Sequence, residues 1–164
     1  MKSINIHLSH IEPSPGASAE ELSKIVLERL GLGPRKKGST EKMHTLLMEL
    51  YERAKTANRE KNPSKAVISV EEMASYAGIS RQTMYDYLGR WTNIDVIKKV
   101  KFLDDKKVTY GYMLNGNTLE QAFEKVHKKV NDNLKYTSEL IDTLQKAVKN
   151  EKISEKMLNK TNDN

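Results

Sequence analysis

The stretch EEMASYAGISRQTMYDYLGRW, residues 71–91, contains two short helical patterns separated by a single glycine, Gly78. Ser69 stands three residues before a glutamate, which is the spacing of a capping box, and this predicts a helix over 70–77. A second helix is expected over 80–91. Glycine adopts positive φ without steric cost, so Gly78 favours a tight turn between the two helices. Two helices joined by so short a turn must cross at close range, and this limits the possible folds more than any other feature of the sequence.

The second of these helices has two different faces. Its apolar residues recur at the spacing of one helical face and are expected to be buried: Met84, Tyr87, Leu88 and Trp91. The outward face then contains Arg81, Gln82, Tyr85, Asp86 and Gly89. Arginine can pair with O6 and N7 of guanine, and glutamine with N6 and N7 of adenine, so the start of this helix is suited to reading bases in a major groove. Asp86 opposes that role, because a carboxylate repels phosphate unless it accepts a hydrogen bond from a cytosine amine.

The remaining sequence predicts two further helices, a hairpin and two short extended segments. Apolar residues at intervals of three and four indicate helices over 19–30 and 40–59. β-Branched and aromatic residues on both sides of an Asp-Asp-Lys-Lys turn indicate strands near 96–103 and 108–114. Residues 66–68 are expected to be extended. An edge strand near the N-terminus is suggested by the alternating residues Ile4, Ile6 and Leu8.

Over residues 40–114 the chain resembles winged helix-turn-helix transcriptional regulators, in the order helix, short strand, helix, turn, helix and hairpin. The resemblance rests on a small residue before the turn, the turn glycine, an anchor after it and the inward positions of the second helix: Ala74, Gly78, Ile79, Met84, Tyr87 and Leu88. It implies a mainly α fold with a small β-hairpin. It also implies a sequence-specific regulator whose partner is double-stranded DNA. The recognition-helix residues that it implies are Ser80, Arg81, Gln82, Thr83, Tyr85, Asp86 and Arg90.

Basic residues at two other places are candidates for contacts with the DNA backbone. The hairpin carries five lysines against two aspartates, a net charge of +3. Its candidate DNA contacts are Lys99, Lys101, Lys106 and Lys107. The alternative is that these lysines only keep an exposed strand from aggregating. The second place is the linker run Arg35-Lys36-Lys37, for which a solvated linker is an equally good interpretation.

The C-terminal part of the chain predicts a long helix, because no Pro or Gly occurs between Thr118 and Asn150. Its apolar residues recur at a period close to 3.5, as in a coiled coil with one irregular step. We therefore expect a homodimer, with a seam formed by Phe123, Val126, Val130, Leu134, Ile141, Leu144 and Val148. Such symmetry suits a protein that reads two half-sites. The alternative is that the helix folds back onto its own domain.

These patterns divide the chain into four parts. They are an N-terminal extension with a short helix (1–39), a winged helix-turn-helix domain (40–115), a coiled-coil-like helix (116–150) and a flexible tail (151–164). Two alternatives to a transcription regulator remain open: a winged-helix protein-interaction module and a non-specific DNA-organising protein.

Composition agrees with a small nucleic-acid-binding protein. The chain has 164 residues and a formal net charge of +6, which attracts polyanions. It has no cysteine, no stretch near the ~20 apolar residues of a membrane span and no secretory signal pattern, so a cytoplasmic protein is expected. No catalytic constellation, nucleotide-binding loop or metal-ligand spacing is present, and His7 and His10 would point to opposite faces of a strand. We therefore expect no enzyme activity, metal or cofactor, and the sequence gives no small-molecule effector.

Overall fold

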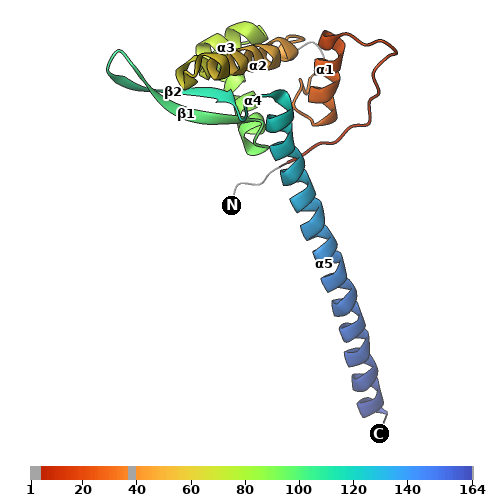
Figure 1. Ribbon diagram of the computed structural model, residues 1–164. Coiled ribbons are helices and arrows are strands. Elements are labelled where there is room, and N and C mark those ends of the chain that lie inside the picture. The colour runs from red at the N-terminus through yellow and green to blue at the C-terminus, as the bar shows by residue number, and fades with distance from the viewer. Residues whose placement is uncertain (1–4, 37–39, 164) are drawn as a thin grey trace. The chain divides into compact units, whose positions relative to one another are not determined.

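A computed structural model describes residues 5–36 and 40–163. Within these residues the fold is mainly helical, with one two-stranded antiparallel hairpin and a long C-terminal helix, as Figure 1 shows. The chain divides into two compact units, one that ends at His127 and one from Lys128 to Asn164. None of the described helices is both long enough and apolar enough to cross a membrane.

The elements agree closely in place with the sequence patterns. In chain order they are α1 (Ala19–Arg29), α2 (Met43–Glu60), the 3-10 helix η1 (Pro63–Ala66), α3 (Val70–Ala77), α4 (Arg81–Asn93), β1 (Ile97–Asp104), β2 (Lys107–Leu114) and α5 (Leu119–Asn162). The predicted helices in the first half of the chain and the predicted hairpin are thereby confirmed to within a few residues.

Serine side chains set where three of the helices begin. Ser18, Ser69 and Ser80 each accept a hydrogen bond from the backbone N–H three residues further on, at the start of α1, α3 and α4. The glutamates three residues after Ser18 and Ser69, which would complete a capping box, have other partners. Glu21 accepts from the backbone N–H of Ser14, and Glu72 pairs with Arg53 at 3.2 Å. Only the serine half of each capping box therefore fixes the helix start.

The core of the first unit lies where α2, α3, α4 and the base of the hairpin meet. Its largest fully buried side chain is the single tryptophan, Trp91 of α4. Leucines of α2 and Met73 of α3 are equally buried. The first turns of α5 join this unit through the buried side chains of Ala122 and Val126. Burial of these apolar faces is what holds the short helices in place, because helices of this length are marginal alone.

The hairpin is anchored at its base and free at its tip. β1 and β2 pair in register from Ile97 opposite Leu114 to Asp104 opposite Lys107. Ile68 adds one antiparallel bridge to Tyr112 at the base, with N–H···O distances of 2.8 and 2.9 Å in the two directions. Beyond that bridge the two strands project past the helices as a ribbon (Figure 1).

Two extended segments differ from the prediction. Ala66 belongs to the 3-10 helix η1, so only part of 66–68 is extended, since Pro63 starts a helical turn just before it. The predicted edge strand is wrong for its described residues, as residues 5–14 are neither helix nor strand. Instead Ser9 N–H donates to the carbonyl of Arg29, which ties this segment to the end of α1. Ile4 lies outside the described residues.

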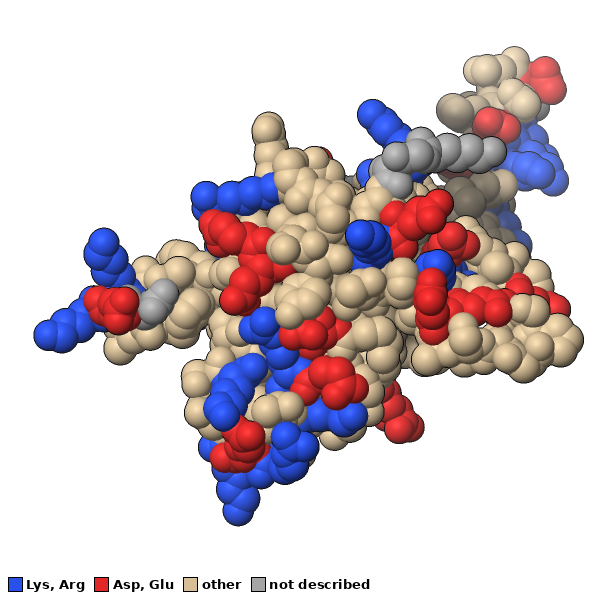
Figure 2. Space-filling model, turned by 90° about the horizontal axis from the view of Figure 1, so that it is seen from above, with Lys and Arg blue, Asp and Glu red and all other residues tan. Residues whose placement is uncertain are grey.

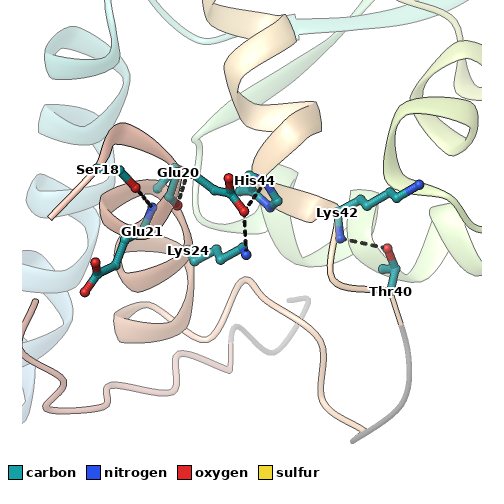
Figure 3. A network of polar contacts seen from close by, with 8 residues as sticks. Ser18, Glu20, Glu21, Lys24, Thr40, Lys42 and His44 are labelled. Carbon is teal, nitrogen blue, oxygen red and sulfur yellow. Dashed lines mark hydrogen bonds and ion pairs between the residues drawn. The ribbon is translucent and has the colours of Figure 1, made fainter. Parts of the chain in front are cut away.

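Polar contacts connect α1 to the start of α2 (Figure 3). Glu20 of α1 lies 2.8 Å from Lys24 Nζ and 3.8 Å from His44 Nε2 of α2. Thr40 accepts from the backbone N–H of Lys42 at 3.0 Å and donates to the carbonyl of Ala77 at the end of α3. The N-terminal helix is therefore packed against the helical body and belongs to the same compact unit.

The last helix, α5, extends further than predicted. It continues past the expected end near Asn150 as far as Asn162, because no Gly or Pro interrupts it. All residues from 131 to 163 are exposed. The second unit is thus a single helix with no core of its own.

Candidate nucleic-acid interface

The turn between α3 and α4 is built around Gly78. This residue caps α3 in the left-handed region, at φ 67° and ψ 35°, and its N–H donates to the carbonyls of Ala74 and Ser75. The N–H of Ile79 also donates to Ala74, at 3.0 Å. Ala74 and Ala77 are buried, which lets the two helices approach closely, whereas Ile79 is only half-buried. The predicted tight corner is confirmed.

The two predicted faces of α4 are also confirmed. Met84, Tyr87, Leu88 and Trp91 are buried. The outward set is exposed: Arg81, Gln82, Thr83, Tyr85, Asp86 and Gly89. Because one face is fixed in the core, the other is held at a defined orientation toward solvent.

Arg81 is the best-positioned cation on this outward face. Its Nη2 donates to the Tyr85 hydroxyl at 3.2 Å, and its Nε lies 3.2 Å from Glu71 of α3. The hydrogen bond with Tyr85 and the charge of Glu71 raise the pKa of Arg81. The guanidinium also lies 5.8 Å from the centre of the Tyr85 ring. Arg81 and Tyr85 are therefore in direct contact at the start of α4.

Ser80 caps α4, so its hydroxyl is engaged within the protein. It accepts from Thr83 N–H at 3.1 Å and lies 2.9 Å from the Thr83 hydroxyl. The other N–H groups of this first turn have no hydrogen-bond partner within the helix, as at any helix start.

Arg90 is engaged within the protein through one of its guanidinium nitrogens. Its Nη1 donates to the carbonyls of Gly31 at 2.7 Å and Gly33 at 2.9 Å, and its guanidinium lies 4.5 Å from the centre of the Tyr87 ring. Burial, followed by the charge of Arg35, lowers the pKa of Arg90. Arg90 therefore has a structural role, and its DNA contact stays a prediction.

The neighbouring tryptophan strengthens this attachment. Trp91 Nε1 donates to the carbonyl of Leu32 at 3.0 Å, so three consecutive carbonyls of 31–33 are bound by two side chains of α4. The sequence contained no signal for these contacts, which join residues 57 to 59 positions apart.

The pairing register defines which hairpin residues share a face. Residues two apart on a strand lie on one face, and directly opposite residues share it. One face therefore contains Lys99 opposite Tyr112, Lys101 opposite Tyr110, and Leu103 opposite Val108. Lys98 lies on the other face, because adjacent residues of a strand point to opposite faces.

Tyr110 is the centre of this lysine-bearing face. Lys99 Nζ lies 4.5 Å from the centre of its ring and Lys101 Nζ 5.6 Å from it. Such cation–π contacts hold long lysine side chains along the surface of the ribbon. Tyr110 is half exposed, and no motif in the sequence marks it as a candidate.

The base of the hairpin adjoins the C-terminal end of α4. Val96 N–H, just before β1, donates to the carbonyl of Trp91 at 3.2 Å. Tyr112 is buried at this base, and burial raises its pKa. Tyr112 shares its side of the ribbon with Lys99, Lys101 and Tyr110.

The other predicted backbone contacts are exposed. Lys106 and Lys107 lie at the hairpin turn, where Asp105 and Lys106 have positive φ. In Figure 2, which looks down on α2 and α3, basic and acidic side chains are mixed over the body, and lysines stand out at the end of the hairpin. In the linker, Arg35 and Lys36 are exposed, while Lys37 lies outside the described residues. No group of three or more potential metal ligands occurs among the residues that the structure describes.

The predicted seam of α5 is divided between the two units. Val126 is buried in the first unit and Phe123 is half-buried there, so Val126 is engaged in its own domain rather than available to a second chain. Val130 is half-buried. The remaining seam residues are exposed: Leu134, Ile141, Leu144 and Val148.

Comparisons with known proteins add no relative. No protein-family model matches the chain, and no curated protein and no solved structure is detectably similar to it.

Proposed function

We propose that this chain is a sequence-specific, double-stranded DNA-binding transcription regulator of the winged helix-turn-helix type, which acts in the cytoplasm as a homodimer. One observation carries the proposal: α4 is seated in the core by Met84, Leu88 and Trp91, and its opposite face presents Arg81, Gln82 and Tyr85 to solvent. An arginine and a glutamine at the start of a rigidly seated helix suit base edges in the major groove, and neighbouring lysines suit phosphates.

Dimerisation rests on the exposed apolar stripe of α5. If Leu134 is assigned to heptad position a, its successors Ile141 and Leu144 occupy a and d. From Val130 to Val148 the stripe is about 27 Å long at ~1.5 Å per residue. An apolar stripe of this length, exposed in a single chain, is best covered by a second copy of the same helix.

The proposal is tested by selecting binding sites from random duplex DNA with the full-length protein. We expect enrichment of one motif with two-fold symmetry, because a symmetric dimer presents two copies of α4. Light scattering on the same sample should give the mass of a dimer. Recovery of all sequences without preference would contradict a specific regulator and would favour a DNA-organising protein.

Two substitutions separate base reading from backbone contact. Arg81→Ala should weaken binding to the selected site by about 1–3 kcal/mol and relax the preference at one position of the motif. Lys106→Ala should weaken binding to all sequences alike and reduce the slope of log K against log salt by about 1. Titrations of fluorescently labelled duplexes at several salt concentrations measure both effects. An Arg81→Ala protein with unchanged preference would contradict the role given to α4.

A protein-interaction module is a second candidate, because carboxylates share the α4 surface. Asp86 is exposed there, and Glu71 already neutralises Arg81. Both groups repel phosphate, whereas both are compatible with a protein partner. Under this alternative, a gel-shift series at low salt shows no DNA binding, while one stoichiometric protein is recovered with the tagged chain.

A further inference from the structure

Two aliphatic side chains are exposed together at the end of the hairpin. Leu103 is 75% exposed, more than any other large hydrophobic side chain that the structure describes, and Val108 is 63% exposed. The register places them directly opposite each other, on the face that contains Lys101 and Tyr110. Contact between the two accounts for part of this arrangement, since a cross-strand apolar pair stabilises a hairpin by ~0.2–1 kcal/mol. It does not explain why the pair lies at the most exposed point of the ribbon.

Cations surround this apolar tip. Lys101 lies two residues before Leu103 on the same face, and Lys106 and Lys107 precede Val108. Lys99 and Lys101 are both held against the Tyr110 ring further down the ribbon. The aspartates of the turn, Asp104 and Asp105, are outnumbered by these lysines.

This combination fits the minor groove of DNA better than a second copy of the chain. Proteins that bind the minor groove insert apolar side chains, leucine included, between base steps while cations contact the flanking phosphates. Two hairpin tips in contact would instead bring Lys101, Lys106 and Lys107 of both copies together and repel. Charge complementarity therefore selects a polyanionic partner.

The position of the tip relative to α4 is also suitable. The bridge from Tyr112 to Ile68 marks where the hairpin leaves the helical body. Val108 lies four residues from Tyr112 toward the turn, so the tip extends ~13 Å beyond that bridge at ~3.3 Å per residue. This reach is comparable to the ~12 Å width of the major groove that α4 would occupy. A hairpin that starts directly after α4 thus extends far enough to meet the adjacent minor groove.

We propose that Leu103 and Val108 form an apolar wedge that enters the minor groove beside the α4 site and partly unstacks one base step. The proposal rests on the proposed function, and it adds a contact that unstacks DNA rather than one that neutralises phosphate. Bending toward the major groove accompanies such unstacking.

The test uses the full-length protein and a duplex obtained by selection, with 2-aminopurine placed at successive positions across and beside the motif. The fluorescence of this base rises when it unstacks. We expect an increase at one step outside the α4 site, together with a bend measured by energy transfer between dyes at the duplex ends. The double variant Leu103→Ala/Val108→Ala should lose both signals and bind about tenfold more weakly, with an unchanged salt slope.

Two control variants distinguish a loss of the apolar wedge from a defect in folding. Leu103→Met/Val108→Ile retains the apolar tip and should retain the fluorescence increase and the bend. Lys101→Ala should retain the fluorescence increase but reduce the salt slope by about 1. Circular dichroism of each free variant should match that of the parent.

The outcomes that overturn the inference are distinct from those that overturn the function. If the parent binds the selected duplex but no position shows increased fluorescence, or if the double alanine variant keeps the signal, the wedge is wrong and DNA binding stands. If the parent binds no duplex, both proposals fail. If the double variant has a lower mass than the parent in the absence of DNA, the tip is a contact between copies of the chain.

Discussion

Arg90 keeps its charge in a half-buried position, where backbone carbonyls take the place of water. The carbonyls of Gly31 and Gly33 accept from one guanidinium nitrogen, and the Tyr87 ring covers one side of the group. A hydrogen bond to a charged group contributes more than a neutral one, about 1.5–3 kcal/mol. Arg81 has the opposite environment, since it is exposed and its partners are on the surface. The two arginines of α4 thus have separable roles, one in stability and, under the proposed function, one in recognition.

The exchange Arg90→Ala should lower the free energy of unfolding by about 1–3 kcal/mol, because it removes the donor of two carbonyls and the stack on Tyr87. Urea unfolding of the first unit measures this change. Arg81→Ala is the matched control and should change stability by less than about 0.5 kcal/mol. Equal stability of the two variants would show that the contacts of Arg90 with 31 and 33 do not stabilise the protein.

At the scale of elements, the geometry of the α3–α4 corner depends on one backbone conformation. Gly78 has a φ of 67°, which a residue with a Cβ adopts only at a cost. The nearest atom to a Cβ at this position would be Lys42 Cδ, at an ordinary contact distance of 3.4 Å. The requirement for glycine is therefore conformational rather than one of space.

Gly78→Ala should lower the free energy of unfolding by about 1–2 kcal/mol, the cost of the left-handed conformation. Gly89 provides a control on the neighbouring helix, because it is inside α4 and nothing lies within 4 Å of a Cβ added there. Gly89→Ala should stabilise the protein by about 0.5–1 kcal/mol, since alanine is the better helix former. Urea titrations of both variants measure the sign of each change in the free energy of unfolding. A stabilising Gly78→Ala would show that the corner rearranges without the left-handed residue.

Contacts between residues a few positions apart could be predicted from the sequence. Contacts that depend on the docking of distant elements could not. The serine caps and the Gly78 turn each involve partners within about one helical turn, so the bounds of α3 and α4 followed from local patterns. The partners of Arg90 lie 57 and 59 residues away, and its spacing on α4 resembled that of an outward residue. The failed edge strand near residue 6 had an alternating pattern but no strand with which to pair.

At the scale of the whole molecule, the proposed self-association depends on the stripe of α5. With Leu134 at position a, the a and d positions from Val130 to Val148 are apolar except for Thr137. The flanking e and g positions in this stretch carry no charge: Asn131, Asn133, Ser138, Leu140, Gln145 and Ala147. Charged e and g residues often set partner choice in coiled coils. Here the association should depend on apolar burial, with little dependence on salt.

Leu144→Asp should raise the dimer dissociation constant at least about 100-fold, because each helix loses a buried leucine and gains a buried carboxylate. Thr143→Asp adds the same charge outside the stripe and should leave the constant nearly unchanged. Sedimentation equilibrium at low and high salt measures both variants. A parent mass that falls as salt increases would contradict an apolar seam.

Because Trp91 is buried in the first unit, two spectroscopic signals can be used to follow the two units of the protein separately. It is the single tryptophan of the chain and is fully enclosed in the core of the first unit. Tryptophan emission therefore follows the environment of that core alone, whereas helical ellipticity contains a large contribution from the 44 residues of α5. One sample monitored at both signals during urea titration will show whether the first unit and the C-terminal helix unfold in one transition or in two.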